Sequence, residues 1–130
     1  MSNRKFVRKL RKAGLRYVVL SFDGLKDDVY LKLRGKRLLR KKLTALRNMK
    51  NEGMIVGLLP AIFNGINRDQ IVPIVKFAAL NNDYIKYISF VMGELPFKES
   101  RVTFSEILEE ISQEVGVNCC LLYTSPSPRE

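Results

Sequence analysis

The stretch that decides the fold is residues 17–24, which read Tyr-Val-Val-Leu-Ser-Phe-Asp-Gly. β-branched and aromatic residues favour the extended state, and an unbroken apolar run is typical of a strand that is covered on both faces. The stretch therefore predicts a buried strand over residues 17–22. Asp23 and Gly24 are expected to end it, because glycine reaches backbone angles that are closed to other residues. Polar groups thus collect at the carboxyl end of a strand, where α/β folds bind ligands, although Asp-Gly is also an ordinary turn.

Helical periodicity and extended runs alternate along the rest of the chain. Helices are predicted over residues 4–13, 39–51, 67–80 and 103–115, a short helix or turn over residues 26–33, and strands over residues 54–62 and 84–92. Because helices separate the strands, we expect parallel pairing through right-handed crossovers. The predicted fold class is α/β, with about three parallel strands and flanking helices. The two edges of such a slab would be bare, so it is expected to be incomplete as an isolated domain.

Several residues mark where these elements end or bend. Pro60 cannot donate to a strand ladder and predicts an irregularity in the second strand. Asn67 suits the N-cap of the helix that follows, and Pro73 predicts a tight opening turn or a mild kink in it. Thr103 and Glu106 have the spacing of a capping box, which predicts a helix beginning there.

Length and composition indicate one ordinary globular domain. The chain has 130 residues, of which 46% are apolar and 28% are charged. No apolar run approaches the roughly 20 residues that span a bilayer. The N-terminus lacks the apolar core of a signal peptide, so a cytoplasmic location is expected.

The net charge of +10 is concentrated in the first part of the chain. Residues 1–50 hold 17 Lys and Arg against 3 Asp and Glu, a net charge of +14. A basic region of this kind is typical of binding to nucleic acid, an anionic ligand or a membrane surface, but also of solvated helix faces. Solvated faces are favoured here, because the basic residues fall on the polar side of apolar-periodic segments. Aromatic residues do not interleave with them, as stacking on single-stranded nucleic acid would require.

The side chains offer little for a metal site. There is no His, which removes the usual general base and nitrogen ligand. The two cysteines, Cys119 and Cys120, are neighbours and fit neither an unstrained disulfide nor zinc spacing. We therefore expect no metal site built from this chain alone.

Three segments, taken in order, resemble the middle of the radical SAM superfamily, whose fold is a partial (β/α)6 barrel. They are residues 13–24, ending in Ser-Phe-Asp-Gly; residues 30–35, Tyr-Leu-Lys-Leu-Arg-Gly; and residues 64–71, Asn-Gly-Ile-Asn-Arg-Asp-Gln-Ile. Together with Arg-Val-Thr at residues 101–103, they are similar to the branch that contains dihydropterin methyltransferase-like and tetraether lipid synthase-like proteins. The resemblance covers about residues 4–117.

The resemblance implies a set of cofactor-binding residues for S-adenosylmethionine (SAM). Ser21 and Asp23 match the polar pair after the fourth barrel strand, near the methionine or ribose portion of the cofactor. Asn64 and Asn67 match the asparagines after the fifth strand, on the adenosine side. Arg34 matches the arginine of the family's Arg-Gly motif, with no role assigned. The alternatives are that Asn67 is only an N-cap and Asp23 only a turn residue.

The chain departs from the family in the segment that defines it. The Cys-x3-Cys-x2-Cys loop, whose thiolates hold a [4Fe–4S] cluster, is absent from the sequence, and so is the glycine-rich segment of the second strand. The first three β/α units are therefore expected to be missing, so that Met1 need not be the natural start. The parent enzyme would use SAM, a [4Fe–4S] cluster, an electron donor and an unknown substrate. This chain alone is expected to do no radical chemistry.

The end of the chain also departs from the family. Residues 120–129 read Cys-Leu-Leu-Tyr-Thr-Ser-Pro-Ser-Pro-Arg and resemble the translation of a common sequencing adapter. Their Pro and Ser content is typical of disorder. We therefore expect a partial radical SAM core over residues 1–117, roughly barrel units four to six, and a disordered, non-native tail over residues 118–130.

Two other interpretations compete with a fragment of a radical SAM enzyme. A small basic β/α module that binds nucleic acid or another anionic partner would explain the charge, and its binding should weaken steeply as salt rises. Nucleic acid is nevertheless not the expected partner. A piece of another β/α barrel enzyme with a phosphate site ranks last, because no glycine-rich strand-to-helix loop is present.

Overall fold

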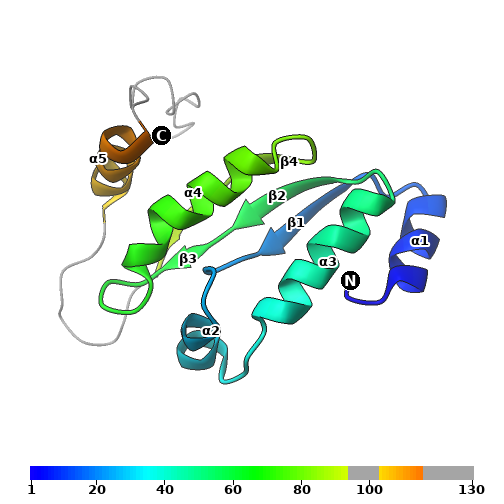
Figure 1. Cartoon of the computed structure of the whole chain (residues 1–130), viewed down its shortest axis with the longest axis horizontal. Coiled ribbons are helices and arrows are strands. Elements are labelled where there is room, and N and C mark those ends of the chain that lie inside the picture. Colours follow the sequence, from blue (N-terminus) through cyan, green and yellow to red (C-terminus); the bar gives the residue numbers. More distant parts are fainter. Residues whose placement is uncertain (94–102, 116–130) are drawn as a thin grey trace, which may run out of the picture.

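The computed structural model describes residues 1–93 and 103–115. Its elements alternate along the chain much as the sequence predicts (Figure 1). In chain order they are α1 (Arg4–Lys12), β1 (Tyr17–Ser21), α2 (Asp27–Arg34), α3 (Leu39–Asn51), β2 (Ile55–Leu59), β3 (Ala61–Ile62), the 3-10 turn η1 (Arg68–Gln70), α4 (Ile71–Leu80), β4 (Ile85–Ile88), β5 (Val91–Met92) and α5 (Phe104–Val115). The predicted tail over residues 118–130 lies outside the described residues.

The sheet is parallel, as predicted. Strands β1, β2 and β4 form a three-stranded sheet in that order, and β3 pairs with β5 in a separate parallel pair. Each predicted long strand is therefore divided in two. The second divides at Pro60, where a prolyl nitrogen has no proton to donate to a neighbouring strand. The α/β fold class, with three parallel strands and flanking helices, is confirmed.

One face of the sheet packs against helices and forms the core. Helices α3 and α4 lie over this face, and α1 lies beside α3 (Figure 1). Leu46 and Met49 of α3 pack with Val56 and Leu58 of β2 in one buried cluster. A second cluster holds α5 against α4 and β3 through Ile62, Ile71, Ile107 and Ile111.

The other face of β1 is open, so the prediction of a strand covered on both faces is wrong. Val18 and Leu20 pack against the core, whereas Tyr17 and Val19 point the other way and are 68% and 52% exposed. Successive side chains of a strand alternate between faces, and within the described part of the chain no helix covers this second face. An apolar run identifies a strand, but the neighbouring elements decide which of its faces is buried.

Two of the local signals have the predicted effect. The 3-10 turn η1 opens the helix that carries Pro73, which places this proline in the first turn of α4, where a missing N–H is tolerated. Thr103 and Glu106 form a capping box. The Glu106 carboxylate accepts the Thr103 N–H at 2.7 Å, and the Glu106 N–H donates to the Thr103 hydroxyl at 3.3 Å.

Candidate functional site

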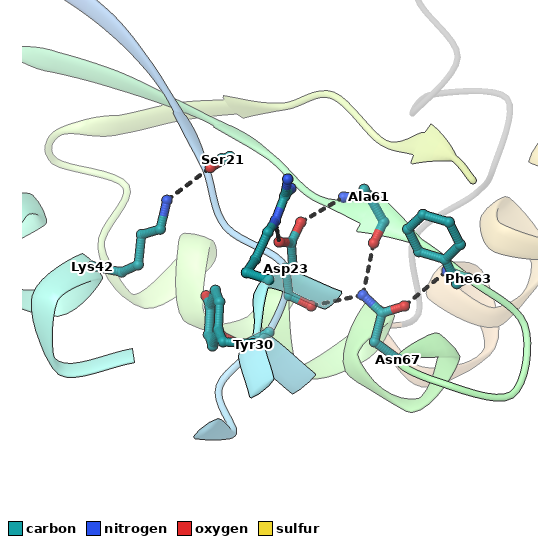
Figure 2. Close-up of polar contacts among 9 residues, drawn as sticks. Ser21, Asp23, Tyr30, Lys42, Ala61, Phe63 and Asn67 are labelled. Atoms are coloured by element: carbon teal, nitrogen blue, oxygen red, sulfur yellow. Dashed lines mark hydrogen bonds and ion pairs between the residues drawn. The ribbon is translucent and has the colours of Figure 1, made fainter. Parts of the chain in front are cut away.

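Asp23 lies just beyond β1 and is fully buried, at the centre of a polar network (Figure 2). One carboxylate oxygen, Oδ1, accepts the backbone N–H of Ala61 at 3.0 Å. The other, Oδ2, accepts Nε of Arg34 at 3.1 Å. Asp23 thus joins the end of β1 to the start of β3 and to the end of α2. These two bonds to separate elements go beyond the role of a turn residue.

Arg34 is the last residue of α2 and reaches back to Asp23. Gly35 follows it with φ of 71°, a left-handed conformation that ends the helix and that glycine adopts without strain. The Arg34 side chain remains 46% exposed, whereas its Asp23 partner is 1% exposed. The guanidinium is therefore held by a buried carboxylate, while the Arg34 side chain as a whole stays partly open to solvent.

Asn67 is fully buried and uses its whole amide group. Its Nδ2 donates to the backbone oxygens of Asp23 at 2.9 Å and Ala61 at 2.7 Å, and its Oδ1 accepts the N–H of Phe63 at 2.8 Å. Asn67 stands at the predicted N-cap position, before η1, but its side chain forms no capping bond there, so the alternative that Asn67 is only an N-cap is wrong. The side chain instead closes the turn after β3 and ties it to the end of β1. Asn64 is half-buried in the same turn.

Gly24 is required by its neighbours rather than by its backbone angles. It is not among the glycines with positive φ, which corrects the expectation from the sequence. A Cβ atom at this position would lie 2.8 Å from Cγ of Gln70, and Gln70 is itself buried and accepts the Leu25 N–H at 2.8 Å. The Gly24 oxygen accepts the hydroxyl of Tyr30 at 2.8 Å. Burial raises the pKa of Tyr30 far above its usual value, so the phenol stays protonated and acts as a donor.

Lys42 is a member of the site that the sequence did not indicate. It lies in the first turn and a half of α3, and its ammonium donates to the hydroxyl of Ser21 at 2.7 Å. Partial burial lowers the pKa of Lys42, while the negative charge of Asp23 opposes this and the positive charge of Arg34 adds to it. Figure 2 shows Lys42 approaching Ser21 on one side of Asp23 and Asn67 lying on the other.

The structure brings four of the five predicted residues together. Asp23, Arg34 and Asn67 share one hydrogen-bonded network, and Ser21 lies two residues before Asp23 at the end of β1. Ser21 and Asp23 lie at the carboxyl end of β1, and Asn67 lies in the turn after β3, where α/β folds bind ligands. Arg34 reaches the same place from the end of α2. Asn64 lies in the turn that Asn67 closes, three residues before it.

The basic half of the chain is partly neutralised within the fold. Arg4 and Arg8 of α1 both contact the carboxylate of Glu52, at 3.6 and 3.3 Å, and Lys50 pairs with Asp83 at 3.4 Å. In the described ranges 1–93 and 103–115, no group of three His, Cys, Asp or Glu residues is placed to hold a metal ion. No helix in those ranges is long and apolar enough to cross a membrane.

Comparison with known proteins identifies the class. The family model of the radical SAM superfamily matches residues 1–78, more than half of the chain, so the chain belongs to the radical SAM superfamily. Enzymes of this superfamily use SAM and a [4Fe–4S] cluster. The resemblance read from the sequence is therefore confirmed at the level of the superfamily.

The chain is also similar to several curated proteins. It is 30% identical over 122 residues to 7,8-dihydro-6-hydroxymethylpterin dimethyltransferase of Methanocaldococcus jannaschii. That alignment covers 88% of this chain and 24% of the relative. It is 30% identical over 112 residues to GTP 3′,8-cyclase of Nautilia profundicola, covering 85% of this chain and 35% of the relative. With GTP 3′,8-cyclase of Campylobacter lari it shares 30% over 108 residues, covering 82% and 34%. The chain thus spans between 24% and 35% of the length of these relatives.

Proposed function

We propose that the chain forms part of the SAM-binding cleft of a radical SAM enzyme, with a partial core domain over residues 1–117. The observation that carries this proposal is the convergence of Ser21, Arg34 and Lys42 at the carboxyl end of β1, around the buried carboxylate of Asp23. A hydroxyl and two cations at the carboxyl end of a parallel strand suit a polar, carboxylate-bearing cofactor. Membership of the radical SAM superfamily supports SAM as that cofactor.

The burial of the candidate residues divides their roles. Ser21 and Arg34 keep exposed surface and are the residues we propose to contact the methionine or ribose portion of SAM. Asp23 and Asn67 are fully buried with their polar atoms engaged, so we propose that they position Arg34 and the turn after β3. Asn64, in that turn, is the residue we propose for the adenosine side.

The chain's own residues do not fit a [4Fe–4S] cluster. Its two cysteines, Cys119 and Cys120, are adjacent and lie outside the described residues, whereas cubane clusters of this type need separated thiolates. Reductive cleavage of SAM needs the electron that such a cluster relays. We therefore propose that this chain alone does no radical chemistry, and that the parent enzyme adds the cluster, an electron donor and a substrate. Detection of 5′-deoxyadenosine after reconstitution of the chain with iron and sulfide would overturn this.

Calorimetric titration with SAM tests the proposed cleft. A charge-assisted hydrogen bond contributes about 1.5–3 kcal/mol, so Arg34→Ala should weaken SAM binding by about 10- to 150-fold. Ser21→Ala should weaken it by a few-fold, as expected for a neutral hydrogen bond. Arg37→Ala is the matched control, because Arg37 is an exposed arginine three residues away. Equal SAM affinity of Arg34→Ala and Arg37→Ala would contradict the proposed role of Arg34.

A basic module that binds nucleic acid is the second candidate, and the charge of residues 1–50 favours it. Phosphate contacts release counterions, so such binding would fall steeply between low and moderate salt. SAM binding through one cleft should depend only weakly on salt. Fluorescence anisotropy with a labelled oligonucleotide across a salt series distinguishes the two, and tight oligonucleotide binding at moderate salt would favour the module.

A further inference from the structure

Lys42 and Ser21 form a pair that the superfamily resemblance does not assign. Lys42 comes from α3 and Ser21 from β1, an edge strand of the sheet, and the distance from Nζ to Oγ is 2.7 Å. The contact is partly buried. An ammonium has three N–H groups, so two of them remain available after this bond, and the Ser21 hydroxyl keeps its own proton to donate.

The charges at this end of β1 do not balance. Two cations, Lys42 and Arg34, interact with one carboxylate, that of Asp23. Both oxygens of that carboxylate already accept bonds, from Ala61 and Arg34. Among the residues that the structure describes, the Lys42 ammonium has a hydrogen bond only to the neutral hydroxyl of Ser21. A partly desolvated cation held by a neutral partner is unfavourable, and an anion placed beside it would remove that cost.

We propose that Lys42 and Ser21 form an oxyanion site that takes a carboxylate or phosphate group of a bound ligand. Both are acceptor-only groups, and the site presents only donors to them: the free ammonium N–H groups and the Ser21 hydroxyl. The site lies beside Arg34 and adds a second cation to the cleft. Its link to the cofactor rests on the function proposed above. The two sources of such a group are the carboxylate of SAM and a phosphate of the substrate.

Substitution at Lys42 separates these sources. Lys42→Met keeps the apolar stem of the side chain and removes its charge, while Lys41→Met is the matched control at the neighbouring, exposed lysine of α3. If SAM supplies the carboxylate, Lys42→Met should weaken SAM binding by about tenfold in calorimetry. Binding of 5′-methylthioadenosine, which lacks the carboxylate, should be the same in wild type and variant. Far-UV circular dichroism and thermal melting establish that both variants are folded.

A second measurement tests the oxyanion site without SAM. Nuclear magnetic resonance of the chain with labelled lysine side chains should show saturable shifts of the Lys42 signal when acetate or inorganic phosphate is added. These shifts should be lost in the Ser21→Ala variant, and the Lys41 signal should not shift. Preference for phosphate, with no effect of Lys42→Met on SAM affinity, would identify the substrate as the source. If SAM does not bind but the anions do, the proposed cofactor cleft fails and the oxyanion site stands. If Lys42 responds to neither anion and Lys42→Met binds SAM as wild type does, the oxyanion site is refuted.

Discussion

Asn67 offers the sharpest test of how the site is held, because two interpretations of it predict opposite results for one substitution. In the network interpretation, both Nδ2 protons are used, by the oxygens of Asp23 and Ala61 at 2.9 and 2.7 Å. In the N-cap interpretation, only the side-chain oxygen matters. Asp caps helices as well as Asn does, so Asn67→Asp should then change stability by less than about 0.5 kcal/mol.

The network interpretation predicts a large loss for the same change. Asn67→Asp keeps an oxygen for the Phe63 N–H but places a carboxylate against two backbone oxygens that lose their donors. Leaving a buried polar group unsatisfied costs about 1–3 kcal/mol, so two such groups cost about 2–6 kcal/mol. Asn67→Ala leaves three groups unpaired, but water can enter the space that it vacates, so we expect a loss of about 3–4 kcal/mol. Either loss is a large part of the 5–15 kcal/mol typical of a domain.

Urea denaturation followed by circular dichroism at neutral pH measures these free energies of unfolding. Asn82→Ala is the control, because Asn82 is an exposed asparagine after α4, and it should stay within about 0.5 kcal/mol of wild type. An Asn67→Asp variant as stable as this control would refute the network interpretation and restore the N-cap.

Three further changes test other parts of the structure. Asp23→Asn keeps an acceptor for the Ala61 N–H but removes the ion pair with half-exposed Arg34. The free energy of unfolding, measured by urea denaturation, should therefore fall by about 1–2 kcal/mol, and calorimetry should show SAM affinity reduced several-fold. Gly57→Ala places a Cβ 2.2–2.6 Å from ring atoms of Tyr87, which is 48% exposed and can rotate outward. We expect the free energy of unfolding to fall by about 1 kcal/mol and tyrosine fluorescence to change, whereas a loss above about 3 kcal/mol would show that the ring is fixed. Hydrogen bonds from the Thr103 backbone and hydroxyl lower the pKa of Glu106 in the folded chain. The stability that Glu106 gives α5 is therefore fully present above pH 4.5, its unperturbed pKa, and is lost as the pH falls through the lower pKa of the folded state. Amide hydrogen exchange in α5 should show this pH dependence, and Glu106→Gln should remove it.

The alternation of elements follows from the sequence because its signals are local. The helix spacing, the capping box at Thr103 and the irregularity at Pro60 each depend on a few neighbouring residues, and the structure shows all three. The open face of β1 depends instead on what packs against it. Tyr17 and Val18 are both apolar residues of one run, yet only Val18 meets the core. Burial on two faces is a tertiary property that a single run does not encode.

The same distinction applies to the site. Ser21 and Asp23 were found from the sequence because they follow a recognisable strand, and Arg34 because it precedes a glycine in a family motif. The sequence does not indicate Lys42, because it is one of three consecutive basic residues that directly follow Leu39, the first residue of α3. Which of the three meets β1 depends on the rotation of the helix about its own axis. That rotation is set by the packing of Leu46 and Met49 against the sheet.

The arrangement of buried and exposed polar groups indicates that the proposed ligand site is preorganised. Asp23 and Asn67 lie in the interior and connect β1, β3 and α2, so the position of Arg34 is fixed by bonds that a ligand does not need to form. Ser21 and Arg34 retain accessible surface above this support. Substitutions of the buried pair should therefore lower stability and ligand affinity together, whereas Ser21→Ala should lower affinity alone. Arg34→Ala should lower both, because it leaves the buried carboxylate of Asp23 without its cation. Such a separation is expected where a rigid polar base holds cations in place before the ligand arrives, because the ordering cost is then met during folding.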